Sequence, residues 1–286
     1  MLCERYAVAD VDSHIIEPAD LWTSRVSSKW GDLVPHVRFH ERRQEDYWYV
    51  GDRKLYGAGA FAQAGWPEFP PSHPRTLSEA ILPAVDPEAR LAYMDEMGIY
   101  YQLLYPNIVG FLASPDDLKG AVDQSKKMDF TRESSLVLLG NAQNIAEVVL
   151  SGVCHRYPDL KFVSVENGAG WLPFLGESMD WQWLNVGAHK DYPDRLLPSE
   201  YMKRQIYGMY WFEHDSVRAV INQLEDNLMF ETDFPHATSL SPGPASESPS
   251  PRDVIERSLA GLSDDVVGKV LQHTATALYQ LDPPAR

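Results

Sequence analysis

Cysteine is scarce in this chain, which carries only Cys3 and Cys154 among its 286 residues. Two cysteines are too few for the disulfide framework that holds small secreted domains together. The cysteine content therefore favours a reducing compartment, and we expect the protein to be cytoplasmic.

Basic residues are also in short supply. The chain has 25 Lys and Arg residues against 41 Asp and Glu residues, which gives a formal net charge of −16 at pH 7. Nucleic acids and anionic membrane surfaces bind clustered Lys and Arg side chains. We therefore expect neither nucleic acid nor a membrane surface as a partner, while the charge indicates nothing about the substrate.

Long hydrophobic runs are absent as well. No apolar stretch of the sequence approaches the roughly 18 residues that a transmembrane helix needs. No apolar segment led by Arg or Lys opens the chain, so the sequence predicts neither a signal peptide nor a membrane span. What is present, 44% hydrophobic and 23% charged residues, is typical of globular proteins and excludes global disorder.

Two short polar clusters, far apart in the sequence, carry most of the chemical information. They are Asp10-Val-Asp-Ser-His14 and Phe230-Glu-Thr-Asp-Phe-Pro-His236, and each closes an apolar run that we interpret as a strand. Asp12 and His14 are two positions apart, so they point to the same side of an extended chain. A carboxylate and an imidazole at one strand end, with another carboxylate at a distant strand end, is how a barrel builds a divalent metal site. The clusters therefore favour an enzyme.

Apolar periodicity predicts strands and helices that alternate along the chain. Strands are expected at residues 6–12, 99–105 (a buried strand), 161–166, 204–212 and 227–232. Helices are expected at residues 87–97, 135–157, 171–184, 217–224, 251–261 and 264–278, although residues 136–139 could instead form a short strand. A chain of this length can form one large α/β domain or two small ones. Because no internal repeat or linker interrupts the alternation, it predicts a single β/α domain over residues 1–286.

The connection after the first strand is unusually long. Residues 17–86 are irregular and rich in aromatic residues and proline, with a hairpin predicted at residues 46–56. A long connection inside a compact domain is typically a lid or a binding loop. Trp22, Trp48 and Trp66 could line such a lid or pack the loop down. A second set of tryptophans, at helical spacing, is expected to pack in the core or between helices: Trp171, Trp181 and Trp183.

Five strands are too few for the barrel that such alternation usually builds. A closed (β/α)8 barrel has eight strands and about 250 residues. The stretch between residues 107 and 161 is too short for three further units of about 30 residues each. The sequence therefore predicts an α/β fold of the TIM-barrel type that is incomplete, with strands three to five missing. The strands at 99–105 and 161–166 would then have unpaired edges unless they pair directly with each other.

Three blocks in this order resemble the amidohydrolase-related (amidohydrolase 2) family. They are Asp10-Val-Asp-Ser-His-Ile-Ile-Glu-Pro18, Tyr157-Pro-Asp-Leu-Lys-Phe-Val-Ser-Val-Glu166 and Phe230-Glu-Thr-Asp-Phe-Pro-His236. Smaller pieces support the resemblance, among them Leu103-Leu-Tyr-Pro-Asn107. The family includes the aminocarboxymuconate-semialdehyde and γ-resorcylate decarboxylases, and the resemblance implies a metal-dependent (β/α)8 barrel, often dimeric.

The resemblance also implies roles for residues at the strand ends. Asp12 and His14 would be metal ligands from the first strand, and Asp233 a ligand from the last strand that also exchanges a proton with the substrate or with water. Glu166 stands where many relatives carry a histidine and is a catalytic candidate, as is His236 near the mouth of the pocket. On the residues alone, Asp12 and His14 could be a polar pair at a strand end, and Asp233 could be a turn residue. Glu166 could be a pocket residue and His236 a loop residue.

The resemblance breaks in the middle of the chain. The family's third to fifth strands have no counterpart between about residues 110 and 130, and with them goes the ligand histidine that follows strand five. His155 is expected to point outward from a helix. His214 follows the strand predicted at 204–212 and could at best substitute for the missing ligand.

Three interpretations follow for the function. The first is a metal-dependent hydrolase or non-oxidative carboxy-lyase, using Zn or Mn because the ligands are mixed oxygen and nitrogen donors, on a small cyclic or aromatic carboxylic substrate. The second is a non-catalytic remnant or binding module that has lost the ligand histidine. The third is a defective product of an internal deletion with exposed apolar barrel edges, which predicts poor soluble expression.

Overall fold

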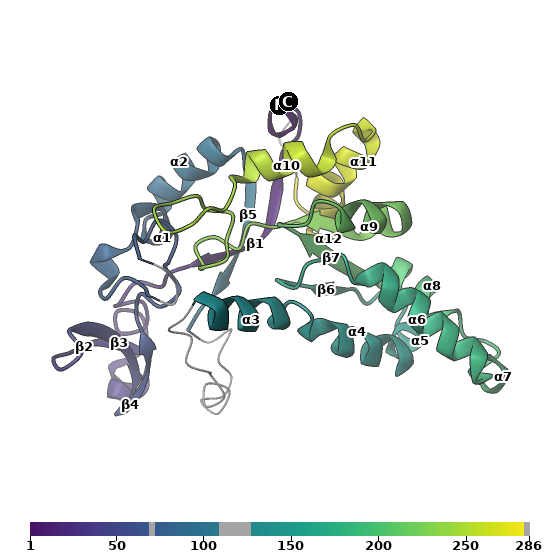
Figure 1. The fold of residues 1–286 in the computed structure, drawn as a ribbon. Coiled ribbons are helices and arrows are strands. Elements are labelled where there is room, and N and C mark those ends of the chain that lie inside the picture. The colour runs from purple at the N-terminus through teal and green to yellow at the C-terminus, as the bar shows by residue number, and fades with distance from the viewer. Residues whose placement is uncertain (69–71, 109–126, 283–286) are drawn as a thin grey trace.

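A parallel sheet of five strands forms the centre of the protein (Figure 1). The computed structural model describes residues 1–68, 72–108 and 127–282. The strands of this sheet are β1 (Ala9–Ile15), β5 (Tyr101–Pro106), β6 (Phe162–Ser164), β7 (Ile206–Tyr210) and β8 (Leu228–Phe230), in the spatial order β5-β1-β8-β7-β6. Consecutive strands of a parallel sheet need crossover helices, which the alternating sequence supplies.

The sheet is a curled half-barrel. Strand β1 pairs with β5 on one side and with β8 on the other, and β7 joins β8 to β6. Strands β5 and β6 form the two edges and are not paired with each other in the part of the chain that the structure describes. The prediction of an incomplete TIM-barrel fold with five strands is therefore confirmed. The missing segment predicted between about residues 110 and 130 lies mostly outside the described residues and stays a prediction.

Helices surround the sheet, and most of them pack against its convex face. The helices are α1 (Leu82–Val85), α2 (Pro87–Met97), α3 (Lys127–Val137), α4 (Gly140–Leu150), α5 (Val153–Arg156), α6 (Leu172–Asn185), α7 (Ala188–Asp191), α8 (Pro198–Gln205), α9 (Ser216–Leu224), α10 (Pro251–Leu259), α11 (Asp264–Gly268) and α12 (Thr274–Tyr279). Shorter turns are η1 (Leu2–Glu4), η2 (Ser28–Leu33), η3 (Leu77–Glu79), η4 (Glu225–Asn227) and the π-helical η5 (Lys269–His273). Side chains alternate along β8, so that Leu228 and Phe230 pack in the large core under the helices while Met229 faces the concave side.

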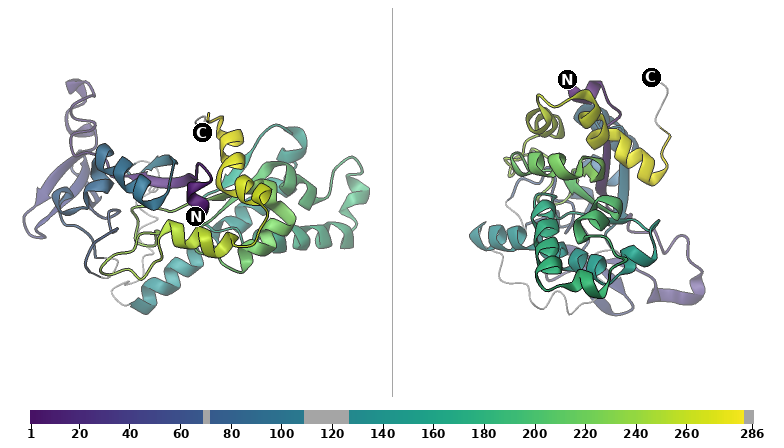
Figure 2. Two further views of the ribbon diagram at one scale, coloured as in Figure 1. Left: turned by 90° about the horizontal axis from the view of Figure 1, so that it is seen from above. Right: turned by 90° about the vertical axis from the view of Figure 1, so that its right-hand side faces the viewer.

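The last helix crosses to the concave face. Ala9 and Val11 of β1 form a cluster there with Met229, and Ala275 of α12 packs onto this cluster. Figure 2 shows the yellow C-terminal helix close to the first strand. The hydroxyl of Tyr101 on the edge strand β5 donates to the carbonyl of Asp282, just beyond α12. The C-terminal segment therefore covers apolar surface that the remaining strands of a closed barrel would cover.

The connection after β1 contains a second, antiparallel sheet. Its strands are β2 (His36–His40), β3 (Glu45–Val50) and β4 (Arg53–Gly57), and Figure 1 shows it to one side of the half-barrel. The hairpin predicted at residues 46–56 is β3 and β4, whereas β2 was not predicted. Trp48 is buried and its ring meets that of Trp22 edge to face at 5.6 Å, so these two tryptophans pack the insertion together.

Several predicted boundaries are wrong. The strand expected at 204–212 begins only at Ile206, because α8 extends through Gln205 from the favourable helix start at Pro198. The helix expected at 135–157 is three helices, broken at Gly140 and at Gly152, which has a φ of +83°. Residues 136–139 form no strand, and the helix expected at 264–278 is divided by the π-helix η5.

Two burial predictions also need correction. Strand β5 was expected to be buried, but it lies at the edge of the sheet and Leu104 is 48% exposed. Trp183 is buried as expected and Trp171 packs against the core. Trp181 is 67% exposed, because helical spacing identifies a shared helix face only for positions three or four apart, and Trp181 and Trp183 are two apart.

No helix among the described residues combines the length and apolar character that crossing a membrane requires.

Packing on the concave face can be tested at Met229, which is fully buried between the sheet and α12. We expect Met229→Ala to lower the free energy of unfolding by about 2–5 kcal/mol, because it leaves a cavity in this cluster. Met128→Ala on α3, where the side chain is 77% exposed, is the matched control and should change it by less than about 0.5 kcal/mol. Urea unfolding measures both, and equal effects would contradict the packing described.

Candidate functional site

The two polar clusters meet at the carboxyl ends of β1 and β8. The Asp233 amide donates to the carbonyl of Asp12 at 2.9 Å, and the His14 amide donates to the carbonyl of Phe234 at 2.7 Å. These bonds continue the pairing of the two strands beyond the end of β8. The two clusters thus lie together at the end of the sheet that carries the functional groups in β/α barrels.

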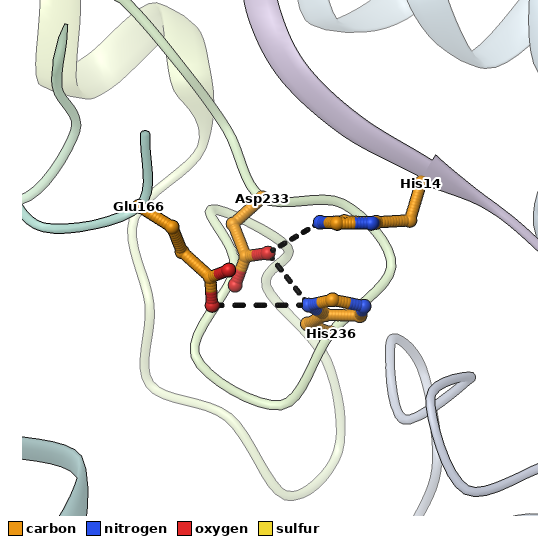
Figure 3. Close-up of side chains that lie close together, drawn as sticks. All are labelled: His14, Glu166, Asp233 and His236. Carbon is orange, nitrogen blue, oxygen red and sulfur yellow. Dashed lines mark ion pairs between the residues drawn. The ribbon is translucent and has the colours of Figure 1, made fainter. Parts of the chain in front are cut away.

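Four side chains form a cluster of possible metal ligands: His14, Glu166, Asp233 and His236. One donor atom from each lies within 4.8 Å of the others. Figure 3 shows the two imidazoles stacked beside Asp233, with Glu166 on the opposite side. The ring centroids of the imidazoles are 3.7 Å apart.

Asp233 is the centre of this cluster. Its Oδ1 lies 3.3 Å from Nε2 of His14 and 2.8 Å from Nδ1 of His236. Nδ1 of His236 also lies 3.9 Å from Oε1 of Glu166. One oxygen of Asp233 thus contacts both imidazoles. The carboxylate of Glu166, which follows β6, approaches His236.

The backbone holds both carboxylates in a strained conformation. Glu166 has a φ of +55° and Asp233 a φ of +58°, in the left-handed region that residues other than glycine seldom adopt. Such conformations cost free energy and concentrate at functional sites. Here each one turns a carboxylate back toward the cluster directly after a strand.

Asp12 lies against the cluster without being one of the four. Its Oδ1 is 3.5 Å from Nε2 of His14, and the side chain is completely buried. Among the described residues neither of its carboxylate oxygens has a hydrogen-bond partner. Burial and the nearby charge of Asp233 raise the pKa of Asp12 to about 9.

Burial and like charges act on the remaining groups too. Burial and the charge of Asp233 raise the pKa of Glu166 to about 7. Burial opposes the charged form of His236, yet Asp233 and then Glu166 raise the pKa of His236 to about 10. Burial would raise the pKa of Asp233, but His236 and His14 lower it, while burial lowers the pKa of His14.

This donor set fits a divalent metal ion. Two imidazoles and two carboxylates are the ligands that Zn²⁺ and related ions prefer in four-coordinate sites. Asp12 adds a buried carboxylate whose oxygens lack hydrogen bonds in the described part of the chain. Buried carboxylates are normally paired, hydrogen-bonded or metal-coordinated, so the residues present match a cation.

A cavity of about 500 Å³ opens beside the cluster and is bounded by Glu166 and His236. Aromatic rings form much of its wall: Phe61, Phe130, Trp211 and Phe212. The ring of Phe61, from the connection after β1, lies 5.5 Å from that of His236. Part of this connection therefore lines the cavity.

The two other candidate histidines lie away from the cluster. His155, on α5, contacts the Tyr201 hydroxyl at 2.9 Å and pairs with Asp194. His214 is half-exposed and pairs with Asp215 at 2.7 Å. Neither takes the place of the strand-five ligand, and the second imidazole of the cluster comes instead from His236.

Several supporting residues were not identified from the sequence. Asp10 accepts hydrogen bonds from the Ser13 hydroxyl at 2.6 Å and from Gln102 at 2.9 Å, which fixes the end of β1. Arg90, from α2, donates to the carbonyl of His14 at 2.7 Å. Glu231, directly after β8, is a further buried carboxylate.

Two more supporting residues lie in the blocks that carry the family resemblance, which was the available signal. Nε2 of His236 lies 3.0 Å from Oδ1 of Asn107. The backbone amide of Asn107 in turn donates to Oε1 of Glu17 at 2.7 Å. Glu17, in the connection after β1, and Asn107, after β5, thereby position the imidazole of His236.

A parallel β/α half-barrel with an imidazole–carboxylate cluster at its strand ends defines a barrel-type fold with a candidate metal site. The chain belongs to the amidohydrolase family, whose profile matches residues 37–281. No curated protein matches the sequence.

Solved structures of other proteins share the fold. An amidohydrolase from Mycobacterium avium subsp. paratuberculosis superposes with a TM-score of 0.65 at 17% identity, covering 96% of this chain and 99% of that one. The IDCase of Metarhizium anisopliae, in its apo form, gives 0.53 at 15% identity over 98% of each chain. A dihydroxybenzoic acid decarboxylase from Polaromonas sp. JS666, with bound manganese, matches 50% of this chain and 40% of its own at 20% identity and a TM-score of 0.40. At these identities the likeness to the first two structures shows the fold alone.

His236 links stability to pH in the metal-free protein. Asp233 favours the charged imidazolium, so the stabilisation from this pair is complete below pH 6.5 and is lost as the pH rises through about 10. We expect the loss of unfolding free energy in His236→Asn, measured with chelator-treated protein in urea, to be largest near pH 6 and to be smaller above about pH 10, where only the contribution of the neutral ring remains. His214→Asn, a half-exposed control, should show no such trend, and an equal loss at both pH values for His236→Asn would refute the assignment.

Proposed function

We propose that this chain is a metal-dependent enzyme, a hydrolase or a non-oxidative carboxy-lyase acting on a small cyclic or aromatic carboxylic substrate. The observation that carries the proposal is the cluster of four donor side chains within 4.8 Å, placed at the strand ends beside a cavity of about 500 Å³. A non-catalytic remnant has no physical need to keep two imidazoles and two carboxylates together in a buried site.

In this proposal His14, Asp233 and His236 hold a Zn²⁺ or Mn²⁺ ion, with the carboxylates of Glu166 and Asp12 beside it. Three protein ligands are enough for a catalytic zinc, so His236 would compensate for the strand-five histidine. When bound, the ion would supply Lewis-acid polarisation of a substrate oxygen.

Proton transfer is assigned to the carboxylates. Glu166 borders the cavity and its pKa is raised to about 7 by burial and by Asp233. A group whose pKa lies near the working pH can both accept and donate a proton. Asp233, whose pKa is lowered by His236 and His14, stays ionised and orients both imidazoles.

The cavity supports a substrate with a small ring. Its volume is within the range of small-molecule sites, and its aromatic walls suit a flat apolar body. No Lys or Arg is among the described residues that line it. A substrate carboxylate would therefore bind to the metal. We further propose that residues 17–86 form a lid within one domain of residues 1–286, and that the protein acts in the cytoplasm.

Metal content tests the proposal directly. We expect purified wild-type protein exposed to Zn²⁺ and Mn²⁺ to retain metal, measured by elemental mass spectrometry, and Asp233→Asn to lose most of it because the cluster loses its central anionic donor. Glu45→Gln, which removes a buried carboxylate held by Tyr47 and His73 in the antiparallel sheet, is the control and should bind as the wild type does. Folded wild-type protein without metal would overturn the proposal.

Glu166→Gln tests the proton-transfer role. We expect it to retain metal through the other three donors but to lower turnover by about 100-fold or more, as loss of a general acid–base does. The measurement is a screen of aromatic and cyclic carboxylic acids and their esters or amides, following CO₂ release and hydrolysis separately. An unchanged rate with the metal still bound would remove Glu166 from the chemistry.

A further inference from the structure

The imidazole of His236 is held through both of its ring nitrogens. Nδ1 lies 2.8 Å from Oδ1 of Asp233, and Nε2 lies 3.0 Å from Oδ1 of Asn107. The ring is 8% exposed and stacks on that of His14. A histidine binds a cation through a ring nitrogen that carries no proton, and the hydrogen bond of the other nitrogen decides which one that is. The ligand atom of His236 therefore depends on Asn107.

The side-chain amide of Asn107 can face His236 in only one orientation. Its Nδ2 donates to the carbonyl of Ile15 at 2.8 Å. Because a carbonyl oxygen only accepts hydrogen bonds, the amide nitrogen must face Ile15 and the amide oxygen must face His236. That amide oxygen also only accepts, so the 3.0 Å contact requires a proton on Nε2 of His236.

A buried carboxylate fixes the backbone of Asn107. Oε1 of Glu17 accepts hydrogen bonds from the backbone amides of Asn107 at 2.7 Å and of Ile108 at 2.9 Å. Glu17 is 4% exposed, and backbone amides that donate to a carboxylate make strong hydrogen bonds. Glu17 follows β1 and Asn107 directly follows β5, so the ends of two paired strands hold this amide in place.

The same arrangement turns Nδ1 of His236 toward the other donor atoms. Nδ1 lies 3.9 Å from Oε1 of Glu166 and 2.8 Å from Asp233, whereas Nε2 faces Asn107. His14 faces the same oxygen of Asp233 with its other type of nitrogen, Nε2, at 3.3 Å. Nδ1 of His236 can give up the proton that it shares with Asp233 when a cation binds, while Nε2 keeps its proton toward Asn107.

We propose that Asn107, held by Glu17, is a positioning residue that keeps a proton on Nε2 of His236 and presents Nδ1 as the metal ligand. The inference rests on the proposed function, because it assumes that the cluster binds a divalent cation. Histidines that ligate metals donate their other ring N–H to a carbonyl, a carboxylate or water, and loss of this partner typically lowers metal affinity about 10–100-fold. Asn107 supplies that carbonyl from outside the four-residue cluster.

Nitrogen NMR of the Zn²⁺-loaded protein identifies the ligand atom. Wild-type protein with ¹⁵N-labelled histidine is saturated with Zn²⁺, and long-range ¹H–¹⁵N correlations show which ring nitrogen carries a proton. The signals of His236 are those that disappear in His236→Asn. We expect a protonated Nε2 and an unprotonated Nδ1 shifted by Zn²⁺. Zn²⁺ on Nε2, or a His236 without Zn²⁺ in protein that retains the metal, would overturn the inference.

Substitution of Asn107 tests whether it acts through His236. We expect Asn107→Leu to lower the Zn²⁺ affinity of the folded protein by about 10–100-fold, measured by competition with a chromophoric chelator. Asn107→Asp keeps an acceptor oxygen and should recover most of the affinity together with the proton on Nε2. Asn144→Leu, which is exposed on α4, is the matched control and should bind as the wild type does. A purely structural role would destabilise Asn107→Leu without changing its Zn²⁺ affinity.

The outcomes separate this inference from the proposed function. Zn²⁺ bound through Nε2, or bound equally tightly by Asn107→Leu and the wild type, would overturn the role of Asn107 and leave the metal centre in place. Folded wild-type protein that retains neither Zn²⁺ nor Mn²⁺ would overturn both. If Asn107→Leu does not fold, the wild-type spectrum decides, because Zn²⁺ on Nε2 contradicts the proposal whatever the variant does.

Discussion

The pairing of the segments that follow β1 and β8 is the constraint on which the site depends. Two backbone hydrogen bonds, from Asp233 to the carbonyl of Asp12 and from His14 to the carbonyl of Phe234, fix the two clusters against each other. These strands are neighbours in the sheet, so the contact does not require a closed barrel. An imidazole–carboxylate centre can therefore persist on a half-barrel whose edge strands β5 and β6 remain unpaired with each other.

Buried polar groups reinforce this pairing from several directions. Asp10 joins β1 to β5 through Gln102 and to β8 through Thr232, while Arg90 fixes the carbonyl of His14 from α2. Each group is completely or largely buried, so its hydrogen bonds are made in a low-dielectric environment where leaving one unmade is costly. The same surroundings shift the pKa values of the site, because burial and mutual repulsion favour protonated carboxylates until a cation is present.

The sequence predicted the residues of the cluster better than it predicted which residues are buried and where the helices pack. The polar groups at the predicted strand ends pointed to His14 and Asp233, and the family resemblance pointed to Glu166 and His236. The structure places all four residues in one cluster. Burial of Glu231 was not predictable, since it depends on how β8 meets β1 across the sheet. Apolar periodicity likewise predicted the last helix, but periodicity does not say which face of a sheet a helix covers, and α12 lies on the concave one.

The most direct test of a metal centre on this half-barrel is a crystal structure of Mn²⁺-soaked protein with an anomalous difference map recorded at the manganese edge. The account predicts a strong peak among His14, Glu166, Asp233 and His236, with the donor atoms drawn in to about 2.0–2.3 Å. Density that shows the same four side chains in contact with each other and no anomalous peak between them would contradict it.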